Sequence, residues 1–249
     1  QNHFDLFVTH QIFPALAASL VGVKPHIFTH HGFMYEHIKK KPLNQMYYLL
    51  EHTFMRLFSK KLTCIIAVDL ESANRIRKYG AHTLTVPVFV NEKKFNPHIS
   101  GEEIRHKYNL GDCLVVLSPK MFYEITGVEY IVQAFSIVSK EIRNAKLLLV
   151  GDGPLRLRLL KLVESLRLKS KVVFAGKLPP SKMPQVYAAS DVVVFHALGG
   201  IQRTALLEAM ASGKPCLGTN ISPFPELVVN GCNGFLVESR AVQELAEAL

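Results

Sequence analysis

The sequence has no apolar run of the roughly 18 residues that a membrane-spanning helix needs, and it begins with no charged-then-apolar targeting signal. Cysteine is also scarce. The four cysteines form no closely spaced pair, which argues against a structural zinc site and favours a reducing compartment. We therefore expect a cytoplasmic protein. The cysteines are Cys64, Cys113, Cys216 and Cys232.

Acidic residues are fewer than basic ones, 20 against 29, which gives the 249-residue chain a formal charge of +9. Such a balance suits nucleic acid, an anionic membrane surface or a phosphate-bearing substrate. The sequence has no zinc-finger pattern and no aromatic-rich basic motif, so we expect no nucleic-acid partner. It also shows no cluster of metal-ligating residues, and we expect no metal site. Apolar residues make up 49% and charged residues 20%, as in globular proteins.

Short apolar runs alternate with helical patterns along the whole chain. This alternation predicts an α/β fold with right-handed crossovers and parallel sheets. The strands expected in the first half are residues 4–9, 26–31, 64–68 and 84–90. Those expected in the second half begin with 113–119 and 145–150 and continue with 171–176, 191–197, 214–219 and 234–238.

A polar stretch with proline and glycine divides the two series of strands. We predict a first Rossmann-like domain over residues 1–95, a linker over about 96–109 and a second Rossmann-like domain over 110–249. In such a fold the ligand is expected in a cleft between the domains, outside the carboxyl ends of the strands. The chain begins inside a strand pattern and ends inside a helical one. We therefore expect a fragment whose first domain is incomplete at its N-terminus.

Glycines follow the strand that ends "LLLVGDGP", at Gly151 and Gly153. Glycine at this position allows the backbone to approach a ligand or the next helix closely. Simple turn chemistry is the other interpretation, and both remain open. The spacing matches neither the dinucleotide-binding motif nor the P-loop.

The stretch "HALGGIQRTALLEAMASGKP", residues 196–215, is a loop that leads into a helix. Thr204 or the residue before it can cap that helix, whose free N–H groups then face an anion. Glu208 lies one turn into an apolar helix, where a carboxylate must accept hydrogen bonds. Sugar hydroxyls are one possible partner and solvent is another. Arg203 is interpreted either as a phosphate contact or as a solvated loop residue.

The run from "AKLLLVGDGP" at Ala145 to "NGFLV" at Val237 resembles the nucleotide-sugar domain of retaining glycosyltransferases of family four, which have the two-Rossmann-domain GT-B fold. In the first half, "IFTHHGF" and "CIIAVDLESANRIRKYGA" are similar to segments of the family's acceptor domain. The resemblance implies a metal-independent transferase that uses no cofactor besides its co-substrate, a nucleotide-diphosphate sugar. The acceptor would be a glycan or a lipid-linked molecule.

The resemblance also implies roles for individual residues. Lys120 lies where the family has an arginine that neutralises the donor diphosphate, and Glu208 matches the glutamate that holds the ribose hydroxyls. Gly176 and Lys177 lie where backbone groups bind the base, and His31 matches an acceptor-side histidine near the transferred sugar. Helix N-terminal amides at Thr204 and Ala205 match those on the diphosphate, with the loop of Ile201, Gln202 and Arg203 before them.

The sequence departs from the family pattern at several of these positions. The glutamate expected eight residues before Glu208, which contacts the donor sugar, is replaced by Gly200. The family's second basic residue is replaced by Thr126, and its usual Gly-Phe-Gly by residues 201–203. Two hypotheses therefore stay open: an active retaining glycosyltransferase, or a catalytically impaired relative that binds a nucleotide sugar without transfer.

The helical segment "KPLNQMYYLLEHTFMRLFSKK" carries lysines around aromatic and aliphatic residues: Lys39, Lys40, Lys41, Lys60 and Lys61. One interpretation is a helix that packs on the core with a solvated basic rim. The other is peripheral contact with the anionic inner face of a membrane, where a lipid-linked acceptor would lie.

Overall fold

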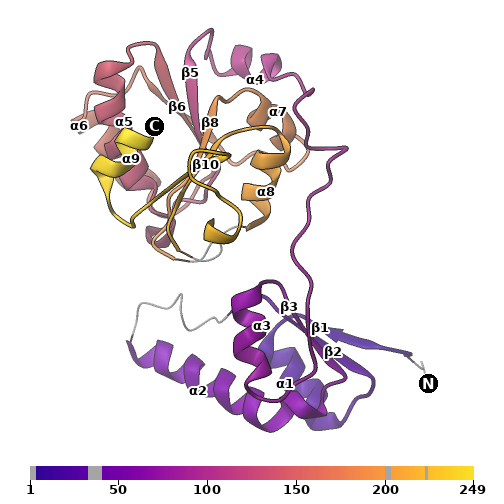
Figure 1. Cartoon of the computed structure of the whole chain (residues 1–249). Coiled ribbons are helices and arrows are strands. Elements are labelled where there is room, and N and C mark those ends of the chain that lie inside the picture. The colour runs from indigo at the N-terminus through magenta and orange to yellow at the C-terminus, as the bar shows by residue number, and fades with distance from the viewer. Residues whose placement is uncertain (1–3, 33–40, 200–202, 222–223) are drawn as a thin grey trace. The chain divides into compact units, whose positions relative to one another are not determined.

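The computed structural model describes residues 4–32, 41–199, 203–221 and 224–249. It divides into two compact units, Gln1–Val88 and Phe89–Leu249, which are described separately below (Figure 1). Each unit contains one sheet in which all the strands are parallel, so the predicted α/β fold with parallel sheets is confirmed.

The first unit has a four-stranded sheet in the order β1-β2-β3-β4. Its elements are β1 (Phe7–Thr9), α1 (Ile12–Val21), β2 (His26–His30), α2 (Lys41–Phe58), the 3-10 turn η2 (Ser59–Lys61), β3 (Cys64–Ala67), α3 (Leu70–Arg77) and β4 (Thr83–Thr85).

Local sequence explains where α3 begins. Asp69 precedes the helix in an extended conformation, and its carboxylate accepts a 2.6 Å hydrogen bond from the backbone N–H of Ser72. This is N-capping, which satisfies a backbone donor that has no partner within the helix. The helices then bury apolar side chains against the sheet in a single core, which includes Phe28, Phe54 and Ile65.

The second unit has a six-stranded sheet and helices on both of its faces. Its elements are α4 (Glu102–Lys107), β5 (Leu114–Ser118), η3 (Glu124–Thr126), α5 (Val128–Glu141), β6 (Ala145–Val150), α6 (Arg156–Ser165), β7 (Val172–Gly176), α7 (Met183–Ala188), β8 (Val192–Phe195), α8 (Arg203–Ala211), β9 (Cys216–Thr219), η4 (Phe224–Glu226), β10 (Gly234–Val237) and α9 (Val242–Ala248).

The strand order of this sheet is β10-β9-β8-β5-β6-β7. The chain builds outward from β5 to β7, then returns to the other side of β5 and builds outward again from β8 to β10. The order therefore reverses between β5 and β8, where Val116 pairs with Val192. In doubly wound sheets, ligands bind outside the carboxyl ends of the strands at such a reversal.

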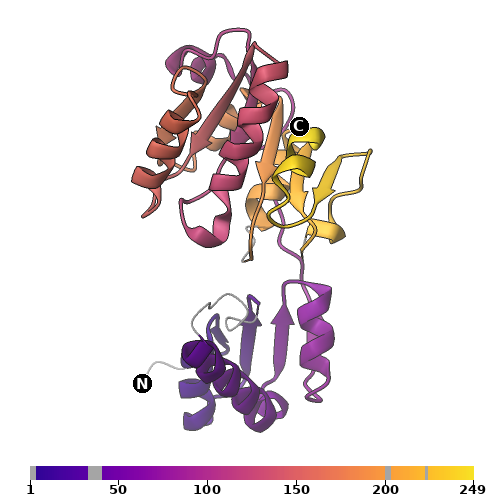
Figure 2. The same ribbon diagram turned by 90° about the vertical axis from the view of Figure 1, so that its left-hand side faces the viewer.

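Two layers of apolar side chains hold the helices to this sheet. One layer joins the sheet to α5, α6 and α9, and the other joins it to α4, α7 and α8. Figure 1 shows the two groups of helices on opposite sides of the strands, and Figure 2 looks onto the face that α5, α6 and α9 cover. This double covering explains why the strands are almost continuously apolar.

Two segments differ from the sequence-based expectation. The strand expected over 84–90 ends at Thr85. Residues 96–109, expected as a linker, lie within the second unit, because Ile104 of α4 is buried in its core together with the flanking Phe95 and Leu110.

Candidate functional site

Lys120 lies at the reversal point of the second sheet. It follows the carboxyl end of β5, and His196 follows the carboxyl end of β8. The Lys120 ammonium Nζ donates a 2.8 Å hydrogen bond to the backbone carbonyl of His196. Only 3% of Lys120 is exposed, and this burial lowers its pKa to about 7. Burial lowers the pKa because desolvation penalises the charged form of the lysine. An anion bound beside Lys120 would raise this pKa again, so that the lysine is protonated and pairs with the anion.

The glycines of "LVGDGP" place the loop that carries Lys120. A Cβ atom at Gly151 would overlap the backbone carbonyl of Lys120, and one at Gly153 would lie 2.6 Å from the carbonyl oxygen of Phe122. The backbone N–H of Phe122 also donates a 3.0 Å hydrogen bond to the carbonyl of Asp152. A close approach is therefore observed, and its partner is the backbone of residues 120–122, which neither sequence-based interpretation had named.

Thr126 is engaged within its own turn. Its hydroxyl oxygen lies 2.7 Å from the carbonyl oxygen of Met121 and 2.6 Å from that of Tyr123. Only 8% of the residue is exposed. The side chain at this position therefore stabilises the η3 turn and supplies no positive charge.

Arg203 begins α8 and forms an ion pair with Glu226 of η4. Its Nη1 lies 3.1 Å from Glu226 Oε2, and only 10% of the arginine side chain is exposed. It is thus not a solvated loop residue. Glu226 was not predicted as a partner of Arg203 from the sequence, although the carboxylate in "FPE" could have indicated one. Gly200, Ile201 and Gln202 lie outside the described residues.

Glu208 lies half-buried in α8, and its carboxylate is held by a tyrosine. The hydroxyl of Tyr187, in α7, lies 3.1 Å from Glu208 Oε2 and 3.2 Å from the backbone carbonyl of Ala205. Burial raises the pKa of Glu208, and the Tyr187 hydrogen bond and the charge of Lys94 oppose this rise. Tyr187 was also missed, because a tyrosine in a short apolar helix looks like an ordinary core residue.

The remaining residues that the resemblance assigns to a donor site follow strands at the carboxyl edge of the same sheet. Thr204, at the start of α8, is exposed, and Ala205 is half-buried. Gly176 ends β7 with φ of 71° and open space where a Cβ would be, and Lys177 after it is exposed. The carbonyl of Gly176 accepts a 2.9 Å hydrogen bond from the N–H of Gly151, which links the ends of β6 and β7.

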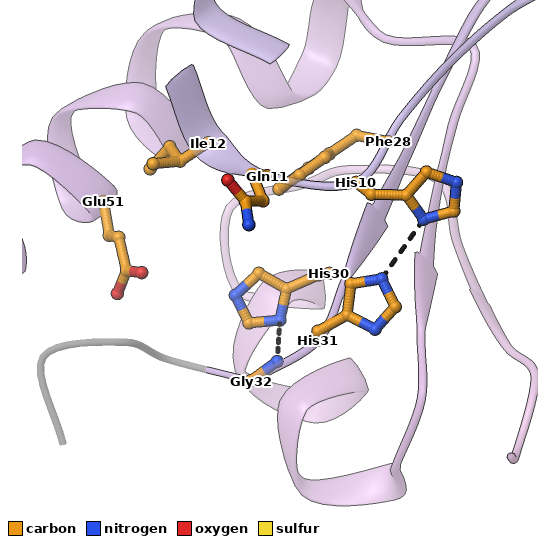
Figure 3. Close-up of a pocket in the computed structure, with 8 residues that line it drawn as sticks. All are labelled: His10, Gln11, Ile12, Phe28, His30, His31, Gly32 and Glu51. Atoms are coloured by element: carbon orange, nitrogen blue, oxygen red, sulfur yellow. Dashed lines mark hydrogen bonds between the residues drawn. The ribbon is translucent and has the colours of Figure 1, made fainter. Parts of the chain in front are cut away.

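His31 lies in the first unit, directly after β2, and lines a pocket of about 340 Å³. A 3.2 Å hydrogen bond joins its Nε2 to Nδ1 of His10, which follows β1 (Figure 3). The remaining lining residues are Gln11, Ile12, Phe28, His30, Gly32 and Glu51. Partial burial, and then His10, lower the pKa of His31. We infer a neutral imidazole near pH 7.

His30 and Glu51 are the most deeply buried polar groups of this pocket, with 4% of each residue exposed. Burial lowers the pKa of His30 to about 4. Its Nδ1 accepts a 3.4 Å hydrogen bond from the backbone N–H of Gly32, as Figure 3 shows. The sequence alone did not identify either residue.

Within the described ranges, no three metal-ligating side chains come close enough to hold an ion, and none of the helices there is long and apolar enough to cross a membrane. The second unit instead carries three separate features after its strands: a buried ammonium group, a helix N-terminus and a half-buried carboxylate. The first two favour an anion, and the third accepts hydrogen bonds from hydroxyl groups.

Comparison with known proteins shows which proteins the chain is similar to. The family described as Glycosyl transferases group 1 matches residues 113–249, more than half of the chain. The chain is 28% identical to the N-acetyl-alpha-D-glucosaminyl L-malate synthase of Bacillus anthracis, over 95% of this chain and 60% of that protein. It is also 28% identical to the UDP-Gal:alpha-D-GlcNAc-diphosphoundecaprenol alpha-1,3-galactosyltransferase of Escherichia coli, over 100% of this chain and 66% of that protein. The chain thus spans about two thirds or less of the length of these relatives.

Solved structures show the same fold. Sucrose-phosphate synthase from Thermosynechococcus elongatus superposes with a TM-score of 0.81 at 22% identity, over 98% of this chain and 63% of that one. Anabaena HepE in complex with UDP-glucose gives a TM-score of 0.80 at 22% identity, over 98% of this chain and 67% of that one. The GT-B fold expected from the sequence is therefore confirmed. The chain belongs to the family of group 1 glycosyl transferases.

Proposed function

We propose that this protein is a retaining glycosyltransferase that moves a sugar from a nucleotide-diphosphate donor to a glycan or lipid-linked acceptor. The observation that carries the proposal is the meeting of Lys120 and His196 at the strand reversal, with α8 beginning at the same sheet edge. Two similar proteins support the proposal. The HepE structure holds UDP-glucose, and the Escherichia coli relative is named for a UDP-galactose donor and a lipid-diphosphate acceptor.

In this proposal the second unit binds the donor and stabilises the leaving diphosphate. The Lys120 ammonium and the free N–H groups at the start of α8, near Thr204 and Ala205, supply positive potential where negative charge develops. Arg203 contributes less, because Glu226 offsets its charge. Glu208 accepts hydrogen bonds from the ribose, and Gly176 and Lys177 lie beside the base. We propose that no metal ion or cofactor is needed besides the nucleotide sugar.

We place the acceptor in the pocket of the first unit. His10 and His31 present ring nitrogen atoms that can form hydrogen bonds with hydroxyl groups, and Ile12 and Phe28 provide apolar walls. Such a lining suits a hydroxylated acceptor.

The second candidate function is binding of a nucleotide sugar without transfer. Two features favour it: Gly200 replaces the carboxylate that would contact the donor sugar, and the hydroxyl of Thr126 is engaged in its own turn. Loss of one charged hydrogen bond to the sugar would cost about 2–4 kcal/mol of transition-state stabilisation. This loss slows transfer and leaves nucleotide binding intact.

The two functions are distinguished by incubating the protein with a panel of nucleotide sugars and acceptors. NMR then follows transfer of the sugar and the anomeric configuration of the product. Transfer that keeps the anomeric configuration supports the retaining enzyme, and inversion contradicts it. Glu208→Gln should lower both activity and UDP affinity. Glu164→Gln, which alters an exposed glutamate of α6, is the matched control and should change neither. UDP binding without turnover of any donor would support the second function.

We further propose a cytoplasmic protein that contacts the inner face of an anionic membrane through α2. Leu43, Met46, Leu49 and Leu57 of this helix are 40–66% exposed, and Lys60 and Lys61 follow its end. Lys39 and Lys40 lie outside the described residues, as does the side chain of Lys41. Sedimentation with anionic vesicles at two salt concentrations tests the contact. Binding that weakens as salt rises supports it, and no binding at low salt rules it out.

A further inference from the structure

A second hollow of the first unit, of about 470 Å³, has a different character from the histidine pocket. We call it the amino-edge pocket. It lies where α2 and α3 end, immediately before β3 and β4 begin, and therefore at the amino ends of the parallel strands. His31 follows the carboxyl end of β2, at the opposite edge of the same sheet. The lining residues are Leu49, His52, Thr53, Arg56, Lys60, Lys78 and Tyr79.

Three of the lining residues are cations, Arg56, Lys60 and Lys78, and no lining residue is acidic. None of the ion pairs found in the described part of the chain uses any of the three. Some other cations of the described chain are paired, as Lys182 is with Glu103 and Arg203 with Glu226, whereas these three unpaired cations line one hollow. The concentration of unpaired positive charge around one hollow therefore needs an explanation.

Local packing holds parts of this lining in place. Gly80 has φ of 75°, and a Cβ there would lie 2.8 Å from Cε of Lys60, so the absence of a side chain lets the lysine stem lie against the backbone. A 2.5 Å hydrogen bond joins the Tyr79 hydroxyl to Nδ1 of His52, which links α2 to the segment after α3. The hydroxyl of Thr53 stands in the same lining as a further donor.

Compensation of helix dipoles accounts for only part of this charge. Each helix C-terminus is equivalent to about half a negative charge, so the ends of α2 and α3 together offset roughly one of the three cations. An excess of roughly two positive charges remains, which matches the charge of a phosphate monoester near pH 7. A guanidinium group and two ammonium groups are also the side chains that bind phosphate oxygens best.

We propose that the amino-edge pocket binds a phosphate group through Arg56, Lys60 and Lys78, with the hydroxyl of Thr53 as an additional donor. The site is independent of the donor site and of transferase activity. Leu49, which is 66% exposed at the pocket, leaves room for an apolar portion of the same molecule. The phosphate can therefore come from a soluble phosphoester or from a lipid headgroup.

The test titrates the isotopically labelled protein with inorganic phosphate and with pyrophosphate and follows backbone amide resonances by NMR. We expect saturable shifts around His52, Lys60 and Tyr79. The double variant Lys60→Gln/Lys78→Gln should bind about tenfold more weakly, because each lost charge removes a charge-assisted hydrogen bond. The double variant Lys60→Arg/Lys78→Arg keeps both charges and should bind within about threefold of the original protein.

Lys161→Gln/Lys169→Gln removes two lysines of the second unit and is the matched control for net charge. Equal weakening in this control, or undiminished binding by Lys60→Gln/Lys78→Gln, overturns the proposal. Because all the substitutions lie on exposed side chains, thermal unfolding should give the same midpoint for every variant.

Vesicles distinguish the two sources of phosphate. Phosphatidylcholine vesicles with and without phosphatidic acid are sedimented with the original protein and the two double variants. Binding that needs phosphatidic acid, is not given by phosphatidylglycerol at equal surface charge and is lost in Lys60→Gln/Lys78→Gln indicates a lipid headgroup, whereas saturable binding of soluble phosphate alone indicates a soluble ligand. Absence of both kinds of binding overturns the proposal, whatever the transferase assays show.

Discussion

Lys120 donates a 2.8 Å hydrogen bond to the carbonyl of His196, and this bond joins the ends of the two strands between which the strand order of the sheet reverses. His196 is itself fully buried. Its Nε2 accepts a 3.2 Å hydrogen bond from the backbone N–H of Arg240, and its ring stacks on Tyr130. The carbonyl that receives the ammonium is therefore held firmly, and a bound diphosphate would compete with it for the same group.

UDP, the nucleotide part of the ligand in the HepE structure, serves as the probe of the proposed donor site, and its binding should take up a proton at Lys120. The pKa of this lysine is lowered to about 7, so at about pH 8 the group is mostly neutral, and a diphosphate beside it raises the pKa again. Calorimetry in buffers of different ionisation enthalpy should show uptake approaching about one proton per site. Lys120→Arg should abolish the uptake, because arginine stays protonated. Lys171→Arg alters a lysine that also donates to a backbone carbonyl and should leave the uptake unchanged. Binding heats that do not depend on the buffer would contradict the prediction.

Removing the Tyr187 hydroxyl should weaken the site that holds Glu208. Tyr187→Phe keeps the buried ring but removes the hydroxyl that lies 3.1 Å from the Glu208 carboxylate. We expect the free energy of unfolding to fall by about 1–2 kcal/mol and UDP affinity to fall by roughly threefold to tenfold. Tyr108→Phe removes a hydroxyl that lies 3.5 Å from another carbonyl of the same unit, and it should leave UDP affinity unchanged. Denaturant titration and calorimetry measure both quantities, and unaltered affinity in Tyr187→Phe would refute the assigned role.

Both units should lose stability in mild acid. The pKa of His30 in the first unit and that of His196 in the second are lowered to about 4, in each case mainly by burial. An unfolded histidine has a pKa of about 6.5, so between about pH 6.5 and pH 4 the unfolded chain binds protons that the folded chain does not. The free energy of unfolding therefore falls with pH in this window, by up to about 3 kcal/mol for each histidine.

Thermal unfolding from about pH 7 to about pH 5 measures this loss. His196→Gln should flatten the dependence for the second unit, whereas His98→Gln at an exposed position should not alter it. If stability depends on pH equally in the original protein, in His196→Gln and in His98→Gln, then His196 does not cause the loss.

A methyl group at Gly153 should disturb the loop that carries Lys120. The new Cβ would lie 2.6 Å from the carbonyl oxygen of Phe122, a contact that requires the backbone to move. We expect Gly153→Ala to lower the free energy of unfolding by about 2 kcal/mol or more and to weaken UDP binding as well. Gly111→Ala, where φ is 54° and nothing lies near the new Cβ, should cost about 1 kcal/mol and leave UDP binding intact. If Gly153→Ala folds and binds UDP with normal affinity, the loop that contains Gly153 does not influence the loop that carries Lys120.

The ion pair between Arg203 and Glu226 should be energetically coupled, because it is largely shielded from solvent. A double-mutant cycle with Arg203→Leu and Glu226→Gln should give a coupling energy of about 1–2 kcal/mol. The cycle on Lys169 and Glu164, whose side chains are 71% and 63% exposed, should give less than about 0.5 kcal/mol. Comparable values for the two cycles would show that burial adds nothing to the Arg203 pair.

Much of the fold could be predicted from local sequence patterns. Alternating apolar runs and helical patterns indicated two parallel α/β sheets, because a strand buried on both faces must be apolar throughout. Boundaries were harder to predict where a short segment packs against distant residues. Ile104 sits in a polar stretch that looks like a linker, and only the partners it meets in the core show that α4 belongs to the second unit.

The candidate site divides in the same way. The sequence by itself determined the α/β class, the helix that carries Glu208 and the position of Lys120 after a strand, because these depend on periodicity and on neighbours along the chain. Only the tertiary structure decided that Lys120 meets His196, that Tyr187 holds Glu208 and that Arg203 pairs with Glu226. These partners are 76, 21 and 23 residues apart in the chain. Their contacts arise from the strand order and from the packing of helices on the sheet, which no local pattern encodes.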